Sequence, residues 1–192
     1  MAIWFRHGDA RFPFLWESGP QAPGRWHDVA HAPATYLADS PDGAWAELLR
    51  HEEITDPADL RGISRRMWAV EVPDAVVEAA PRPTLATETL CGDLASYPAC
   101  QRYATELRQA GATALHAPSA ALAPAGGGGQ KVDGGLVEAA GRDGATLVLF
   151  GGHWPDVRAW AAVDVGAPTL RQLQQVRHFQ DGATLPASSS AS

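Results

Sequence analysis

The 192-residue chain contains no asparagine, a single lysine (Lys131) and only two cysteines, Cys91 and Cys100. The cysteines are nine residues apart and have no CxxC partner, so neither a disulfide framework nor a four-cysteine zinc site is available. No stretch reaches the roughly 18 apolar residues that a membrane-spanning helix needs. The N-terminal residues show no basic region followed by a long apolar run, so no signal peptide is indicated. We therefore expect a cytoplasmic protein with no metal site and no membrane contact.

Positive charge is also scarce, because 15 Lys and Arg stand against 22 Asp and Glu, for a formal net charge of −7. This balance counts against direct binding of nucleic acid or of an anionic membrane, both of which require a basic surface. It does not exclude a small anionic ligand, since a pocket needs only one or two well-placed arginines. Hydrophobic residues make up 45% of the chain and charged residues 19%, which is typical of a globular protein with a substantial core.

Short strand patterns are mixed irregularly with a few helical patterns. Strands are expected at 3–7, 12–16, 35–38, 67–72, 114–118, 146–150 and 160–165, and helices at 41–51, 99–110 and 170–178. Residues 120–135 include four consecutive glycines and are expected to form a loop. The pattern favours an α+β fold in a single domain over residues 1–182, followed by a disordered tail at 183–192.

The clearest helix signal begins at Ser40. Ser40 is a typical N-cap residue, Pro41 suits the first helical position, and Asp42 suits the positive end of the helix dipole. The apolar face that follows consists of Ala44, Trp45, Leu48 and Leu49. Glu47 lies at the border of this face, and periodicity alone does not decide whether its carboxylate is half-buried or solvated.

Three familiar motifs are incomplete in this chain. The glycine run Gly126–Lys131 resembles a phosphate loop but lacks the Gly-Lys-Ser/Thr ending. His27 and His31 are four residues apart, as in the metalloprotease motif, but Pro33 follows closely and aspartate replaces the glutamate base, so metal binding is disfavoured. The segment 62–66 lacks the closing glycine of a nucleophile elbow, so no serine hydrolase is indicated.

A sparser set of functional side chains remains. Arg25 lies beside Trp26 after a Gly/Pro-rich stretch, Tyr36 lies on an expected strand, Glu47 on the capped helix, and Ser119 at the end of an extended segment. Taken singly, each residue has an ordinary explanation, such as a surface charge, a core aromatic ring, a solvated helix residue or a turn hydroxyl. Their significance depends on their order and spacing.

That order and spacing resemble the RES domain family, which is named for its Arg, Glu and Ser. The resemblance rests on Gly24-Arg25-Trp26, residues 34–41, Ala44–His51, the strand at 68–72 with Pro73-Asp74, Ala117-Pro118-Ser119, and Arg6 in the opening strand. It covers roughly residues 3–120. Two differences from the usual family pattern are His27, where Asn is common, and the Gly-rich stretch after Ser119.

The resemblance implies a fold like that of the ADP-ribosyltransferases and a bacterial toxin, from a toxin–antitoxin pair, that consumes NAD+. It implies that Arg25, Tyr36, Glu47 and Ser119 line the NAD+ site, with NAD+ as substrate and no separate cofactor. It further implies a small helix-turn-helix antitoxin as partner. The main hypothesis is that the protein is an NAD+ glycohydrolase. The alternatives are an ADP-ribosyltransferase that modifies a protein, and a RES-like module that binds a nucleotide or partner without turnover.

The chemistry of this hypothesis needs few protein groups. Nicotinamide is already a cationic leaving group, and the transition state resembles an oxocarbenium ion, so one carboxylate, Glu47, suffices to stabilise it. Arg25 would hold the pyrophosphate through charge-assisted hydrogen bonds. Tyr36 and Trp26 are candidates for stacking on the nicotinamide, and Ser119 for fixing a ribose hydroxyl or the amide.

Overall fold

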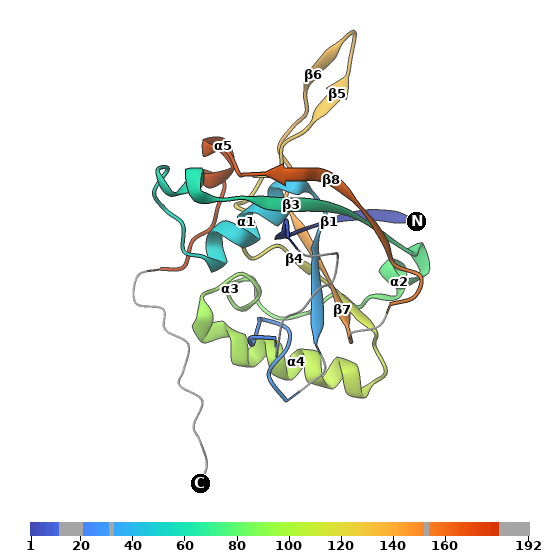
Figure 1. Ribbon diagram of the computed structural model, residues 1–192. Coiled ribbons are helices and arrows are strands. Elements are labelled where there is room, and N and C mark those ends of the chain that lie inside the picture. The colour runs from blue at the N-terminus through green and yellow to red at the C-terminus, as the bar shows by residue number, and fades with distance from the viewer. Residues whose placement is uncertain (12–20, 31–32, 152–153, 181–192) are drawn as a thin grey trace.

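The computed structural model describes residues 1–11, 21–30, 33–151 and 154–180, which are built around an antiparallel six-stranded sheet (Figure 1). The strand order is β4-β7-β2-β1-β3-β8. The strands are β1 (Ala2–Asp9), β2 (Ala34–Ala38), β3 (Arg65–Val72), β4 (Ala114–Pro118), β7 (Ala145–Phe150) and β8 (Arg158–Gly166). Each pair of neighbouring strands is antiparallel. The α+β single-domain class expected from the sequence is confirmed.

Helices and short helical turns connect these strands. They are α1 (Pro41–His51), α2 (Asp74–Ala79), α3 (Thr87–Leu90), α4 (Tyr97–Gln109) and α5 (Leu170–Leu173), with 3-10 turns η1 (Asp59–Gly62) and η2 (Leu94–Ser96). Helix α1 begins as expected, because the Ser40 hydroxyl accepts a hydrogen bond from the backbone N–H of Gly43. Gly111 follows α4 with φ of 89°, the left-handed conformation that terminates a helix. The short helices α2 and α3 lack a clear apolar period and were not expected.

Two expectations are wrong in part. The stretch 120–135 is not wholly a loop, because β5 (Gln130–Val132) pairs with β6 (Leu136–Glu138) in a hairpin that projects from the main sheet (Figure 1). The helix expected at 170–178 ends at residue 173, because Val176 instead forms a β-bridge with Leu122. The strand expected at 12–16 and the tail expected at 183–192 lie outside the described residues.

The packing around β2 explains where a pocket forms. Ala34, Tyr36 and Ala38 share one face of the strand because side chains alternate. Ala34 and Tyr36 pack in the cluster that includes residues of α4, whereas Ala38 packs with α1 and β3. Leu37 points to the opposite face, where it packs with Trp4 and with α2. Helices α1 and α4 thus lie along the same face of β2, with Tyr36 between them.

Candidate active site

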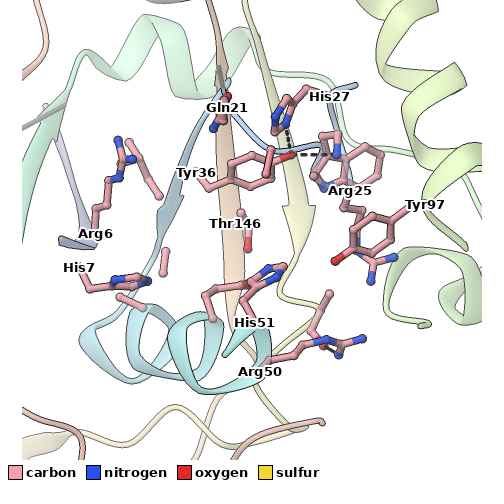
Figure 2. A pocket seen from close by; sticks show the side chains of 18 of the residues that line it. Arg6, His7, Gln21, Arg25, His27, Tyr36, Arg50, His51, Tyr97 and Thr146 are labelled. Atoms are coloured by element: carbon pink, nitrogen blue, oxygen red, sulfur yellow. Dashed lines mark hydrogen bonds and ion pairs between the residues drawn. The ribbon is translucent and has the colours of Figure 1, made fainter. Parts of the chain in front are cut away.

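A cavity of ≈ 310 Å³ lies on this face of the sheet (Figure 2). Its ionisable lining residues among those described are Arg6, His7, Arg25, His27, Tyr36, Glu47, Arg50, His51 and Tyr97. Glu47 is the only carboxylate in the described lining, and three arginines line the same cavity. The described lining therefore carries a net positive formal charge, three arginines against one carboxylate, although the whole chain carries −7. Such a cavity attracts an anionic ligand and offers one negative group to a cationic part of that ligand.

Glu47 is presented to the cavity by helix α1, and its side chain is 22% exposed. Its Oε2 lies 3.5 Å from Nε2 of His51, one helical turn later. Burial alone would raise the pKa of Glu47, but the hydrogen bond and charge of His51, together with the charges of Arg50 and Arg25, hold that pKa below its ordinary value. Glu47 is therefore a carboxylate at neutral pH.

Ser119 follows β4 and contacts the Glu47 carboxylate from outside the cavity lining. Its hydroxyl donates to Oε1 of Glu47 at 3.5 Å and accepts from the backbone N–H of Leu122 at 3.0 Å. Ser119 is 5% exposed and does not belong to the cavity lining. The structure thus brings Ser119 to the carboxylate, and it does so from the second layer of side chains rather than from the wall.

Tyr36 stands at the centre of the cavity with its hydroxyl already engaged (Figure 2). That hydroxyl accepts from the backbone N–H of Trp26 at 2.9 Å and lies 3.0 Å from Nδ1 of His27. Burial raises the pKa of Tyr36 well above its ordinary value, so the phenol stays protonated. The Trp26 side chain is only 2% exposed and packs in the core beside α4. Trp26 therefore helps to fix Tyr36 through its backbone, while Tyr36 offers its ring to the cavity.

Arg25 is 6% exposed and extends from the segment before β2 toward the residues around α3. Its Nη1 donates to the carbonyl of Thr89 at 3.0 Å and to the hydroxyl of Ser96 at 2.7 Å, and its Nη2 donates to the carbonyl of Gly92 at 2.6 Å. The guanidinium carbon lies 4.7 Å from the centre of the Tyr97 ring, a cation–π distance. No described residue accepts a hydrogen bond from Nε or from the second N–H of Nη2.

The sequence did not lead to four ionisable residues of the cavity wall, which are His7, Arg50, His51 and Tyr97. Arg50 and His51 follow Glu47 on α1, and a helical period of 3.6 places residues three and four positions apart on one side. This spacing from Glu47 is visible in the sequence and predicts that Arg50 and His51 lie on the same side of the helix as Glu47. His7 lies on β1 next to Arg6, and only the pairing of β1 with β2 brings it to the cavity. Burial, with the nearby charges of Arg65 and Arg6, lowers the pKa of His7 to about 3, so this ring is neutral.

Four of the five candidate residues therefore line one cavity, namely Arg25, Trp26, Tyr36 and Glu47. The fifth, Ser119, contacts the carboxylate of Glu47. Within the described ranges, no group of three or more His, Cys, Asp and Glu residues is placed to hold a metal ion. None of the helices described is long and apolar enough to cross a membrane.

Comparisons with known proteins agree with this fold. A family model described as the RES domain matches residues 3–164. A 61-residue stretch is 44% identical to the protein named Toxin Res from Pseudomonas putida strain KT2440, and it represents 32% of this chain and 40% of that relative. The matched stretch thus spans about two fifths of the relative's length. The crystal structure of the M. tuberculosis MbcT–MbcA toxin–antitoxin complex contains a similar chain, with a TM-score of 0.54, 18% identity, and coverage of 92% of this chain and 88% of that chain.

Fold and cavity together define an α+β protein in which a cationic pocket is built around one helix carboxylate. The chain belongs to the RES domain family, since the family model matches most of its length. The match continues to residue 164, so it is longer than the region 3–120 in which the motifs were recognised. It includes the β5–β6 hairpin and most of β8.

Proposed function

We propose that this protein is the toxin of a toxin–antitoxin pair and that it cleaves the nicotinamide–ribose bond of NAD+. The observation that carries the proposal is the single carboxylate, Glu47, in a described cavity wall whose other formal charges are arginines. NAD+ combines an anionic pyrophosphate with a cationic nicotinamide ring, so its charges complement those of the cavity. Membership of the RES domain family supports the same assignment.

In this proposal Glu47 acts on the ribose carbon that loses nicotinamide. The electron pair of the breaking C–N bond leaves with nicotinamide, which becomes neutral, and positive charge develops on the ribose as an oxocarbenium ion. A carboxylate in a partly dehydrated site stabilises that charge much more strongly than one in bulk water. Water then adds to the ribose carbon and loses a proton, giving ADP-ribose. Ser119 holds the Glu47 carboxylate in position for this step.

The remaining contacts would bind and orient the substrate. Arg25 has two N–H groups not engaged by described residues, and these would donate to pyrophosphate oxygens. Tyr36 would pack its ring against the nicotinamide, since its hydroxyl is held by Trp26 and its orientation is therefore fixed. Such a preformed ring costs little entropy on binding.

An antitoxin partner is part of the proposal. The relatives carry the names of a toxin and of a toxin–antitoxin complex. By analogy we propose a small helix-turn-helix protein that binds this chain and closes the cavity. Co-expression of the adjacent reading frame should then suppress the growth defect caused by this chain, and a gene without such a neighbour would weaken the assignment.

The deciding experiment is incubation of the purified protein with NAD+ labelled in the adenylate part. Release of nicotinamide with free labelled ADP-ribose supports hydrolysis. A labelled protein band after addition of a cell lysate would instead identify an ADP-ribosyltransferase. Calorimetric binding of NAD+ with no nicotinamide release would identify a binding module without turnover.

A further inference from the structure

The backbone carbonyl of Gly92 accepts hydrogen bonds from two buried guanidinium groups. Nη2 of Arg25 donates to it at 2.6 Å and Nη2 of Arg50 at 2.7 Å. The two side chains are 6% and 1% exposed, and Figure 2 shows both guanidinium groups at the same side of the pocket. A carbonyl oxygen has two lone pairs, so these two charged donors use its full capacity.

Each arginine is also fixed by contacts of its own. Arg50 donates from Nη1 to the carbonyls of Ala120 and of Arg177, the latter at 2.8 Å, and its guanidinium stacks on Phe179 at 4.3 Å. These contacts hold the Arg50 guanidinium between α1 and two loop segments. The donor that Arg50 presents to the Gly92 carbonyl is therefore held in place by contacts that do not involve Arg25.

The two guanidinium groups repel each other, and burial, followed by the charge of Arg25, lowers the pKa of Arg50. A shared oxygen between them offsets this repulsion, because it lies within hydrogen-bond distance of both. If the oxygen moved, Nη2 of Arg25 would lose its acceptor and the guanidinium could rotate about its remaining contacts. The Gly92 carbonyl is thus the contact that fixes the Nη2 end of Arg25, while the Thr89 carbonyl and the Ser96 hydroxyl hold Nη1.

Gly92 itself has no room for a side chain. A Cβ atom there would lie 2.2 Å from the carbonyl oxygen of Glu88, well inside van der Waals contact. A larger residue would have to displace this backbone, and the shared carbonyl with it. Changing Gly92 therefore perturbs the same contact as changing Arg50, without altering any charge.

We propose that Arg50 is a positioning residue that holds Arg25 in its ligand-binding orientation through the Gly92 carbonyl. The proposal rests on the proposed function, in which Arg25 binds the substrate pyrophosphate. Arg50 needs no contact with the substrate for this role. Its loss should weaken substrate binding, while His51 and Arg25 still hold the pKa of Glu47 down and keep its carboxylate ionised for the chemistry.

The test separates KM from kcat for NAD+ cleavage in Arg50→Gln, Arg50→Lys and Gly92→Ala. Loss of a charge-assisted hydrogen bond corresponds to roughly a 10- to 100-fold change in an equilibrium constant. We expect KM to rise by about tenfold or more and kcat to stay within about threefold. A merely structural role would reduce the folded fraction, so the apparent kcat would fall while KM stayed unchanged, and that result would overturn the proposal.

Combining the substitutions gives a second criterion. Arg50→Gln and Gly92→Ala act through one carbonyl, so the double variant should have a KM close to that of the worse single variant. Effects on KM that multiply would mean that the two residues act independently, against the proposal. Gly62→Ala is the matched control, because a Cβ at Gly62 meets nothing within 4 Å and Gly62 lies outside the cavity lining.

Hydrogen exchange keeps this inference separate from the proposed activity. If the wild-type protein does not consume NAD+, the proposed function fails, but the role of the Gly92 carbonyl remains testable. Arg50→Gln and Gly92→Ala should both accelerate amide exchange at Leu90, Cys91 and Ser96, whose N–H groups are bonded within this segment. Unchanged amide exchange in both variants would refute the positioning role of Arg50, and this result does not depend on an enzymatic assay.

Discussion

Glu47 is the residue whose replacement should damage NAD+ cleavage most, and Glu47→Gln isolates the reason. Glutamine preserves the shape of the side chain and its ability to accept from Ser119, but it removes the negative charge. The folded protein keeps Glu47 ionised, since His51, Arg50 and Arg25 hold its pKa below the ordinary value against the opposing effect of burial. The substitution therefore removes a charge that is present at neutral pH.

The size of the effect follows from the position of the carboxylate. A unit charge about 4 Å from the developing oxocarbenium ion interacts with it by about 4 kcal/mol at an effective dielectric constant of about 20. This corresponds to about a thousandfold in rate. Because the Glu47 side chain is 22% exposed, water screens part of the interaction. We expect kcat to fall by about 10² to 10³, the range observed when single preorganised electrostatic groups are removed from active sites.

The assay is nicotinamide release by purified protein, with far-UV circular dichroism and the urea unfolding midpoint as checks of folding. Glu52→Gln is a matched control, because Glu52 directly follows α1, is 57% exposed and does not belong to the cavity lining. It should leave kcat unchanged. A folded Glu47→Gln protein that cleaves NAD+ at the wild-type rate would refute both the role of the carboxylate and the proposed reaction.

Three further expectations concern Tyr36, Ser119 and His7. Tyr36→Phe leaves the Trp26 N–H without its acceptor and should cost about 1–3 kcal/mol in urea denaturation, whereas unchanged stability would contradict the contact. Ser119→Ala should lower kcat by about tenfold, because a support of Glu47 is lost, and a larger loss than in Glu47→Gln would argue against this supporting role. The pKa of His7 falls from 6.5 to about 3 on folding, so the unfolded chain binds the extra proton between these values. This contribution to stability is complete above pH 6.5 and is lost as pH falls toward 3. His7→Gln should flatten the unfolding free energy over that interval, and an unchanged slope would exclude His7 as the cause.

Most of the regular elements were predictable because local signals fixed them. Helix α1 has an N-cap serine, a proline at its first position and an apolar face, and each signal acts over a few residues. The helix expected at 170–178 forms only over 170–173, because contacts distant in the sequence replace it beyond that point. There the backbone after residue 173 finds partners at Ala121 and Leu122, which are about 50 residues away in the chain, and such contacts leave no periodic trace in the sequence.

The candidate site was recognised through motif order rather than through periodicity. Glu47 and Arg25 each have an ordinary explanation when taken alone, and their family pattern made them candidates. The motif did not distinguish a residue that lines the cavity from one that contacts Glu47 from behind the lining. Ser119 was a candidate site residue yet lies behind Glu47, while Arg50, which lies within the matched stretch Ala44–His51, was not a candidate yet lines the cavity.

The sequence by itself determined the α+β class, the capped helix that carries Glu47, and the family to which the chain belongs, because these depend on short-range chemistry and on motif order. Only the tertiary structure decided that a chain of net charge −7 brings three arginines and one carboxylate into the described lining of a single cavity, since these residues come from segments that are distant in the sequence. It also decided that Arg25 and Arg50, 25 residues apart, share one carbonyl oxygen. Such a contact is set by the packing of α1 against the residues around α3, and no local pattern encodes it.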